Sequence, residues 1–189
     1  MEVIVVKTKS AKSAKSKTTT RVKEPLKFLS PPKALFVGID PGVNGAIVGI
    51  WGQDILTCLK MPKTEYDILD CIDELGINDE ESPIARLEWI HPSIYGISKG
   101  DMSKLYGNYM QLRMALAASR LRWETTRAQD WQQALGIARR KKTENTTQWK
   151  NRLKARAQQL FPQEKVTLWN CDALLIATYC QRFEQGQLK

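Results

Sequence analysis

The sequence contains little of what a zinc protein or a disulfide-stabilised protein needs. Its 189 residues include one histidine and four cysteines, and the cysteines form no Cys-x-x-Cys pair: Cys58, Cys71, Cys171 and Cys180. A zinc site is therefore not expected, and scattered thiols suit a reducing, cytoplasmic compartment. Apolar runs are also short. None approaches the length of a membrane span, so we expect no membrane partner.

Acidic residues are scarce in two stretches, and positive charge is concentrated there. The chain has a formal charge of +9. Residues 1–33 hold nine Lys or Arg and two acids, residues 120–160 hold eleven Lys or Arg and three acids, and the stretch from Asp54 to Glu88 is acidic. A basic surface beside an acidic centre suits a protein that attracts phosphates and holds metal ions. A solvated surface without a partner is the alternative.

Residues 1–33 are rich in Lys, Ser and Thr, and we interpret them as a disordered basic tail before one folded domain at residues 34–189. Such a tail suits a nonspecific DNA-binding arm in a bacterial or phage-encoded protein. The alternative is a transit segment, which would place the protein in a plastid or other organelle. The tail contains Lys rather than Arg, which disfavours that alternative.

Short apolar runs and amphipathic stretches predict an α/β fold. We expect strands at residues 35–40, 45–51, 54–60, 84–90 and 122–126, and helices at residues 65–75, 102–119, 128–135, 146–160 and 171–183. Three strands joined by tight turns, then strands alternating with helices, indicate a mixed sheet flanked by helices. Trp89 alternates away from Glu88 along its strand and is expected in the core.

Three carboxylates fall at the ends of these expected elements. Asp40 ends the first strand, Glu88 lies near the end of the fourth, and Asp172 opens the apolar last helix. Separately, Asp40 could cap its turn and Asp172 its helix. In one pocket they would repel each other unless divalent cations balanced them. Carboxylate oxygens favour Mg²⁺ or Mn²⁺, and two such ions could bind a phosphate and activate water, with Asp40 bridging both.

The chain resembles the RuvC-type Holliday-junction resolvases of the RNase H-like superfamily on motifs that occur in family order: Val37-Gly38-Ile39-Asp40-Pro41-Gly42, Leu87-Glu88 and Asp172-Ala173-Leu174-Leu175-Ile176-Ala177. Further motifs resemble its phage and plastid branch, among them Asp130-Trp131-Gln132-Gln133-Ala134-Leu135-Gly136. The resemblance covers residues 35–183. It implies an RNase H-like mixed five-stranded sheet and a homodimer. It also implies Mg²⁺-dependent nicking of two opposed strands of a four-way junction, leaving 5′-phosphate and 3′-hydroxyl ends. Asp40, Glu88 and Asp172 match three of the family's four metal-binding acids.

The fourth acid of the family is missing. RuvC-type enzymes usually have another carboxylate, or a His, three or four residues before the last Asp, where this chain has Trp169 and Leu168. Asn170 is the nearest candidate ligand, and Glu164 is a distant one. Three explanations stay open: a natural three-acid site, an introduced Asp-to-Asn substitution, or a degenerate relative. The last would be a catalytically weak or inactive junction-binding protein, which is the alternative function.

Candidate DNA contacts lie outside the acids: His91, Arg139, Arg140, Lys141, Lys142, Lys150 and Lys154. His91, three residues after Glu88, is expected to contact DNA or assist a proton transfer, or else to stack on a neighbour at the surface. The basic residues are expected to contact phosphates, with an inert solvated face as the alternative. Ile94 or Tyr95, in the loop after His91, would wedge at the branch point, unless that loop is merely flexible.

Overall fold

The structure is a computed structural model that describes residues 35–76, 83–93 and 98–188. The chain divides into the units Met1–Ser30 and Pro31–Lys189, and every element below belongs to the second unit. The expected tail at residues 1–33 and the wedge candidates Ile94 and Tyr95 lie outside the described residues. Among the described helices, none has the length and apolar character needed to cross a lipid bilayer.

Five strands form one mixed sheet in the order β3-β2-β1-β4-β5. Their bounds are β1 Phe36–Asp40, β2 Ala46–Trp51, β3 Asp54–Lys60, β4 Ile84–Glu88 and β5 Arg122–Thr126. The central strand β1 pairs antiparallel with β2 and parallel with β4. Because β1 and β4 run in the same direction, their carboxyl ends meet at one edge of the sheet, and these ends are Asp40 and Glu88. The predicted fold class is confirmed.

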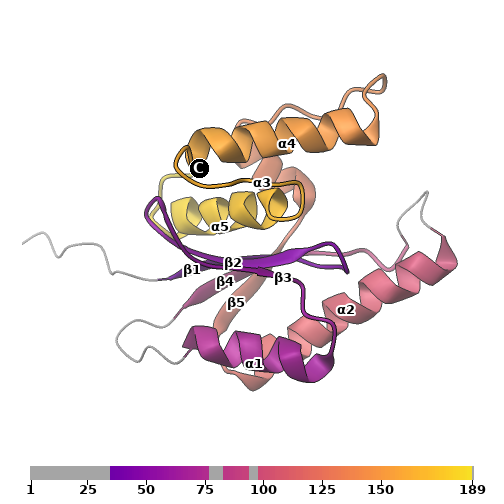
Figure 1. The fold of residues 1–189 in the computed structure, drawn as a ribbon, viewed down its shortest axis with the longest axis vertical. Coiled ribbons are helices and arrows are strands. Elements are labelled where there is room, and N and C mark those ends of the chain that lie inside the picture. The colour runs from indigo at the N-terminus through magenta and orange to yellow at the C-terminus, as the bar shows by residue number, and fades with distance from the viewer. Residues whose placement is uncertain (1–34, 77–82, 94–97, 189) are drawn as a thin grey trace, which may run out of the picture. The chain divides into compact units, whose positions relative to one another are not determined.

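Helices cover both faces of the sheet (Figure 1). One face packs against α1 (Glu65–Gly76) and α2 (Lys99–Ala118), and the other against α3 (Ala128–Ala134), α4 (Thr146–Leu160) and α5 (Cys171–Glu184). Helix α5 is buried continuously from Cys171 to Cys180 because it lies between the sheet and α4. A sequence that is apolar on every side predicts such a helix.

Helix α5 packs directly on β1 because β1 has a glycine at the contact. A Cβ atom on Gly38 would lie 2.1 Å from the Ala173 carbonyl oxygen and 2.3 Å from the Ala177 nitrogen. Only glycine allows this approach, which brings the first turn of α5 over the end of β1. On the other face, Gly42 adopts a φ of 109°, and its N–H donates to Asn108 Oδ1 at 2.7 Å. The turn after Asp40 is thereby tied to α2.

Three local expectations need correction. The fourth strand ends at Glu88 rather than residue 90, and the helix expected at 102–119 begins at Lys99 because the Ser98 side chain accepts a hydrogen bond from the Asp101 N–H. The prediction that Trp89 lies in the core was wrong. The chain leaves the sheet after Glu88, so the Trp89 ring is 41% exposed and packs edge-on against His91.

Candidate active site

Asp40 and Glu88 form a carboxyl pair at the edge of the sheet. The register sets Ile39 opposite Leu87, so Asp40 and Glu88 follow as the next neighbours at the ends of β1 and β4. Burial, with the charges of Glu88 and Asp172, raises the pKa of Asp40 well above its usual range. Burial, with the charge of Asp172, raises the pKa of Glu88 to about 7.

Asp172 is the third acid, on the first turn of α5. Its side chain is buried, and its charge acts on both Asp40 and Glu88. Asp172 Oδ2 pairs with the Lys150 ammonium, and Oδ1 accepts a hydrogen bond from Cys171 Sγ at 3.5 Å. The structure therefore brings the three predicted acids into one electrostatic neighbourhood. Across the described ranges, however, no three His, Cys, Asp or Glu side chains form a ready-made metal cluster. The Asp172 carboxylate faces Lys150 instead.

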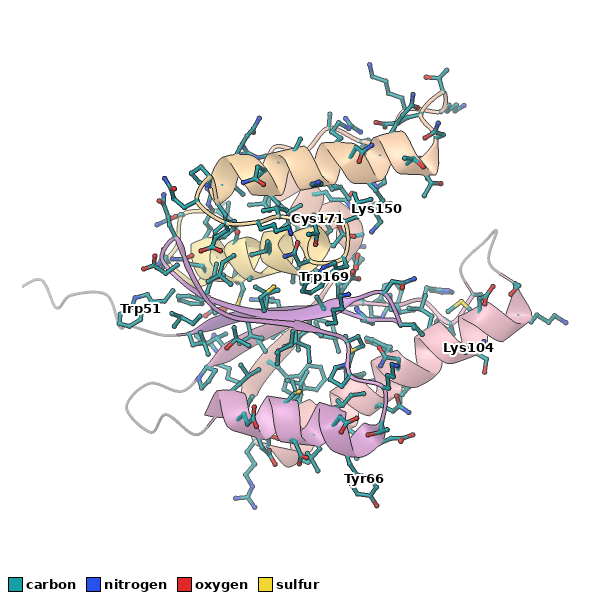
Figure 2. The ribbon with its side chains drawn as sticks, viewed as in Figure 1. Trp51, Tyr66, Lys104, Lys150, Trp169 and Cys171 are labelled. Carbon is teal, nitrogen blue, oxygen red and sulfur yellow. The ribbon has the colours of Figure 1, made fainter. Side chains whose placement is uncertain are left out.

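Lys150 has a role that its sequence position did not indicate. The sequence predicts a phosphate contact, whereas the structure pairs Lys150 with Asp172, and Figure 2 shows Lys150 beside Cys171 at the start of α5. Burial alone would lower the pKa of Lys150, but the Asp172 carboxylate outweighs it and raises that pKa above its ordinary value. Lys150 is therefore a permanent positive charge at the acids.

An open pocket of about 520 Å³ lies in front of Asp40. Its walls are the β1–β2 turn, the first turns of α2 with Asp101 and Lys104, and the side chains of Lys150 and Leu168. Lys104 and Lys150 come from helices on opposite faces of the sheet (Figure 2). Sequence reasoning missed Lys104, because nothing in its local pattern distinguishes it from the other basic residues. Asp40 thus faces an opening that is flanked by two cations.

Trp131 is a buried neighbour of Glu88. Its side chain is among the largest that are fully buried, and its Nε1 atom has no fully formed hydrogen bond to a described residue. The indole N–H acts on Glu88 and favours the ionised carboxylate, although burial and Asp172 dominate that pKa. A buried N–H group without a hydrogen-bond partner is unfavourable. The Trp131 N–H would gain such a partner if the neighbouring Glu88 side chain were an ionised carboxylate. Trp131 belongs to a motif that resembles the phage and plastid branch, but the sequence did not indicate that it acts on Glu88.

Asn170 does not support a fourth ligand position. Its Oδ1 atom accepts hydrogen bonds from the Thr167 backbone nitrogen at 2.7 Å and from Thr167 Oγ1 at 3.0 Å. Its backbone oxygen accepts from the Leu174 nitrogen at the start of α5. The amide therefore organises the turn before α5, and its only side-chain acceptor is already used. The alternative candidate Glu164 is exposed on the turn after α4.

The other candidate DNA contacts lie at the surface, and one of them, Arg140, is engaged in hydrogen bonds there. Arg139, Lys141 and Lys142 are exposed, and Lys154 is half-buried on α4. The Arg140 guanidinium instead donates to the Glu144 carbonyl oxygen and to Thr146 Oγ1, and so stabilises the start of α4. His91 is exposed, stacks edge-on against Trp89, and accepts a hydrogen bond at Nδ1 from the Ser93 N–H. This is the surface arrangement that the sequence left open for His91.

Two solved structures share this architecture. One, described as T. thermophilus RuvC in complex with Holliday junction substrate, has a TM-score of 0.57 at 13% identity and covers 82% of this chain and 98% of that chain. The other, described as the Thermus thermophilus RuvC structure, has a TM-score of 0.52 at 14% identity with the same coverage. The chain has a RuvC-like fold. No protein-family model and no curated protein matches its sequence. Membership of the phage and plastid branch stays a prediction.

The side chains at the strand ends of this RuvC-like fold suit a hard divalent cation. Asp40, Glu88 and Asp172 offer only carboxylate oxygens, which Mg²⁺ and Mn²⁺ prefer. The raised pKa of Asp40 and of Glu88 reflects burial together with crowded negative charge, and Lys150 is the described cation that acts on both groups. A divalent cation bound by this pair would offset that negative charge.

Proposed function

We propose that this protein is a metal-dependent, structure-selective endonuclease that resolves four-way DNA junctions as a homodimer. The observation that supports it best is the grouping of Glu88 and Asp172 around Asp40, which itself lines a pocket flanked by Lys104 and Lys150. Clustered carboxylates can hold the metal ion that phosphodiester hydrolysis requires, and neighbouring lysines can attract the DNA phosphate. The RuvC-like fold supports the same activity, and one of the similar RuvC structures contains a Holliday junction substrate.

Each side chain has a separate task in this proposal. Asp40 and Glu88 would hold Mg²⁺ or Mn²⁺, which would supply Lewis-acid stabilisation of the phosphate and a more acidic water, and the buried Asp172 carboxylate would add negative charge beside the ion. Lys104 and Lys150 would hold the DNA phosphate in the pocket in front of Asp40. The Trp131 N–H would keep the Glu88 carboxylate oriented and ionised. Water would attack the phosphorus in line, and the bond to the leaving oxygen would break.

The DNA arms would follow the basic surface beyond the pocket. Arg139, Lys141, Lys142 and Lys154 are proposed phosphate contacts, because they are not committed to the side-chain ion pairs described above. His91 is a proposed contact near the branch point, three residues from Glu88. Arg140 would act mainly by holding this basic loop against the start of α4.

The homodimer is proposed because a junction with two-fold symmetry requires two sites related by the same axis. A groove of about 460 Å³ between α1 and α2, lined by Leu69, Met110 and Met114 among others, is the proposed contact with the second copy. Met114 is 66% exposed on this apolar surface. If the groove forms the interface, Met114→Glu will convert a dimer into a monomer in light scattering, and a dimeric variant would rule this interface out.

Cleavage of a synthetic four-way junction tests the proposed activity. The wild-type chain should make paired nicks in Mg²⁺ and none in EDTA. Asp40→Asn removes one carboxylate without changing its shape, so cleavage should fall by at least about 100-fold while junction binding persists. Linear duplex of the same sequence is the substrate control. Binding by the wild type without any nick would favour the junction-binding protein, for which the missing fourth acid is the specific argument.

A further inference from the structure

The charges of Asp40, Glu88 and Asp172 and of their partners limit how many divalent ions this site can hold. Both oxygens of Asp172 already have partners, since Oδ2 pairs with Lys150 and Oδ1 accepts from Cys171. Asp40 and Glu88 are neighbours at the ends of β1 and β4, and neither of them forms an ion pair with a described side chain. When both are ionised, these two carboxylates carry two negative charges, which a single divalent ion would neutralise.

The rest of the pocket, as far as the described residues line it, offers no second set of ligands. Leu168, which is 48% exposed, occupies the wall where another carboxylate would face Lys150, and the Asn170 oxygen is bonded to Thr167. Asp101 lines the same pocket, but its carboxylate accepts from Ser98 Oγ at 2.7 Å, and the Lys104 side chain lines the same wall. A second divalent ion would have to displace Lys150 from a buried carboxylate.

We propose that the site holds one divalent cation, bound by Asp40 and Glu88, and that the Lys150 ammonium takes the place of a second ion beside Asp172. This inference rests on the proposed nuclease function. Lys150 is a compact charge that is half-buried, lines the open pocket, and so meets both Asp172 and an incoming phosphate. Its role is to supply fixed positive charge at a site where the three carboxylates of the sequence led us to expect two ions.

Counting bound Mn²⁺ tests the inference without any need for cleavage. The full-length chain is freed of metal with EDTA, dialysed, and titrated with Mn²⁺ while the free ion is followed by electron paramagnetic resonance. The wild type should bind about one Mn²⁺ per chain. Lys150→Gln frees Asp172 and should bind about two, whereas Lys150→Arg keeps the charge and should stay at about one. Lys154→Gln, one turn further along α4, is the matched control and should also stay at about one.

A second variant covers the case in which Lys150→Gln fails to fold, which circular dichroism will detect. Leu168→Asp adds a carboxylate to an exposed position of the pocket and leaves the Lys150–Asp172 pair intact. It should raise the count to about two ions per chain. Two ions in the wild type, or an unchanged count in both folded variants, would overturn the inference. If a wild type with two ions still cleaves junctions, only the inference fails. If the wild type binds no Mn²⁺ and cuts nothing, the proposed function fails as well.

Discussion

Replacing Glu88 by Gln should make the metal-free protein more stable at alkaline pH, although it damages the proposed active site. The folded-state pKa of Glu88 is about 7, against 4.5 for an unperturbed glutamate. The folded state therefore binds more protons than the unfolded state between these two values. It follows that the free energy of unfolding falls as the pH rises through this window. The substituted glutamine side chain would be neutral throughout and could still donate a hydrogen bond to Asp40.

The size of this effect follows from the displacement of the pKa. Because the folded-state pKa lies near 7 rather than 4.5, the wild type should lose roughly 2 to 3 kcal/mol of stability between pH 5 and pH 8. Glu88→Gln does not lose this stability, because its side chain stays neutral at both pH values. Its hydrogen bond to an ionised Asp40 would lower the pKa of that carboxyl group, which adds to the stability of the variant at pH 8.

Urea unfolding of both proteins in EDTA at pH 5 and pH 8 measures the difference. We expect nearly equal midpoints at pH 5 and a higher midpoint for Glu88→Gln at pH 8. Glu74→Gln, at an exposed position on α1, is the control and should show no pH-dependent difference from the wild type. Mg²⁺ added at pH 8 should stabilise the wild type more than Glu88→Gln. Equal stability of the two proteins at both pH values in EDTA would refute the assignment of Glu88 as a buried, protonated carboxyl group.

Three further substitutions each test one feature of the structure: the packing of α5 on β1, metal ligation by Asn170, and DNA contact by Lys142. Gly38→Ala would place a Cβ atom within 2.1 Å of the backbone of α5, so we expect a loss of about 2 to 3 kcal/mol in chemical denaturation together with weaker Mn²⁺ binding. Asn170→Ala should cost about 2 kcal/mol through the lost hydrogen bonds to Thr167 but leave the Mn²⁺ count unchanged, whereas a ligand role would lower the count. Lys142→Gln should flatten the salt dependence of junction binding by about 0.9 in log–log slope, and an unchanged slope would remove Lys142 from the DNA surface.

The predicted elements were recovered because their signals are local. The β-branched run before Asp40, the Pro-Gly turn and the apolar stretch of α5 each determine their own backbone conformation. The prediction failed where the chain leaves regular structure. Trp89 follows strand alternation in the sequence, but its strand has already ended, so its ring reaches solvent.

The sequence by itself determined which residue types are available at the candidate site: three carboxylates at the ends of buried elements, no zinc ligand set, and a basic stretch after residue 120. Only the tertiary structure decided which partner each of these side chains has. Lys150 pairs with Asp172 across 22 residues of chain, Asp40 pairs with Glu88 across the sheet, and Asn170 bonds within its own turn. Coulomb energies depend on distance and burial, and separation along the chain fixes neither of them. For that reason the identity of the acids could be predicted, while their charge state and the role of Lys150 required the fold.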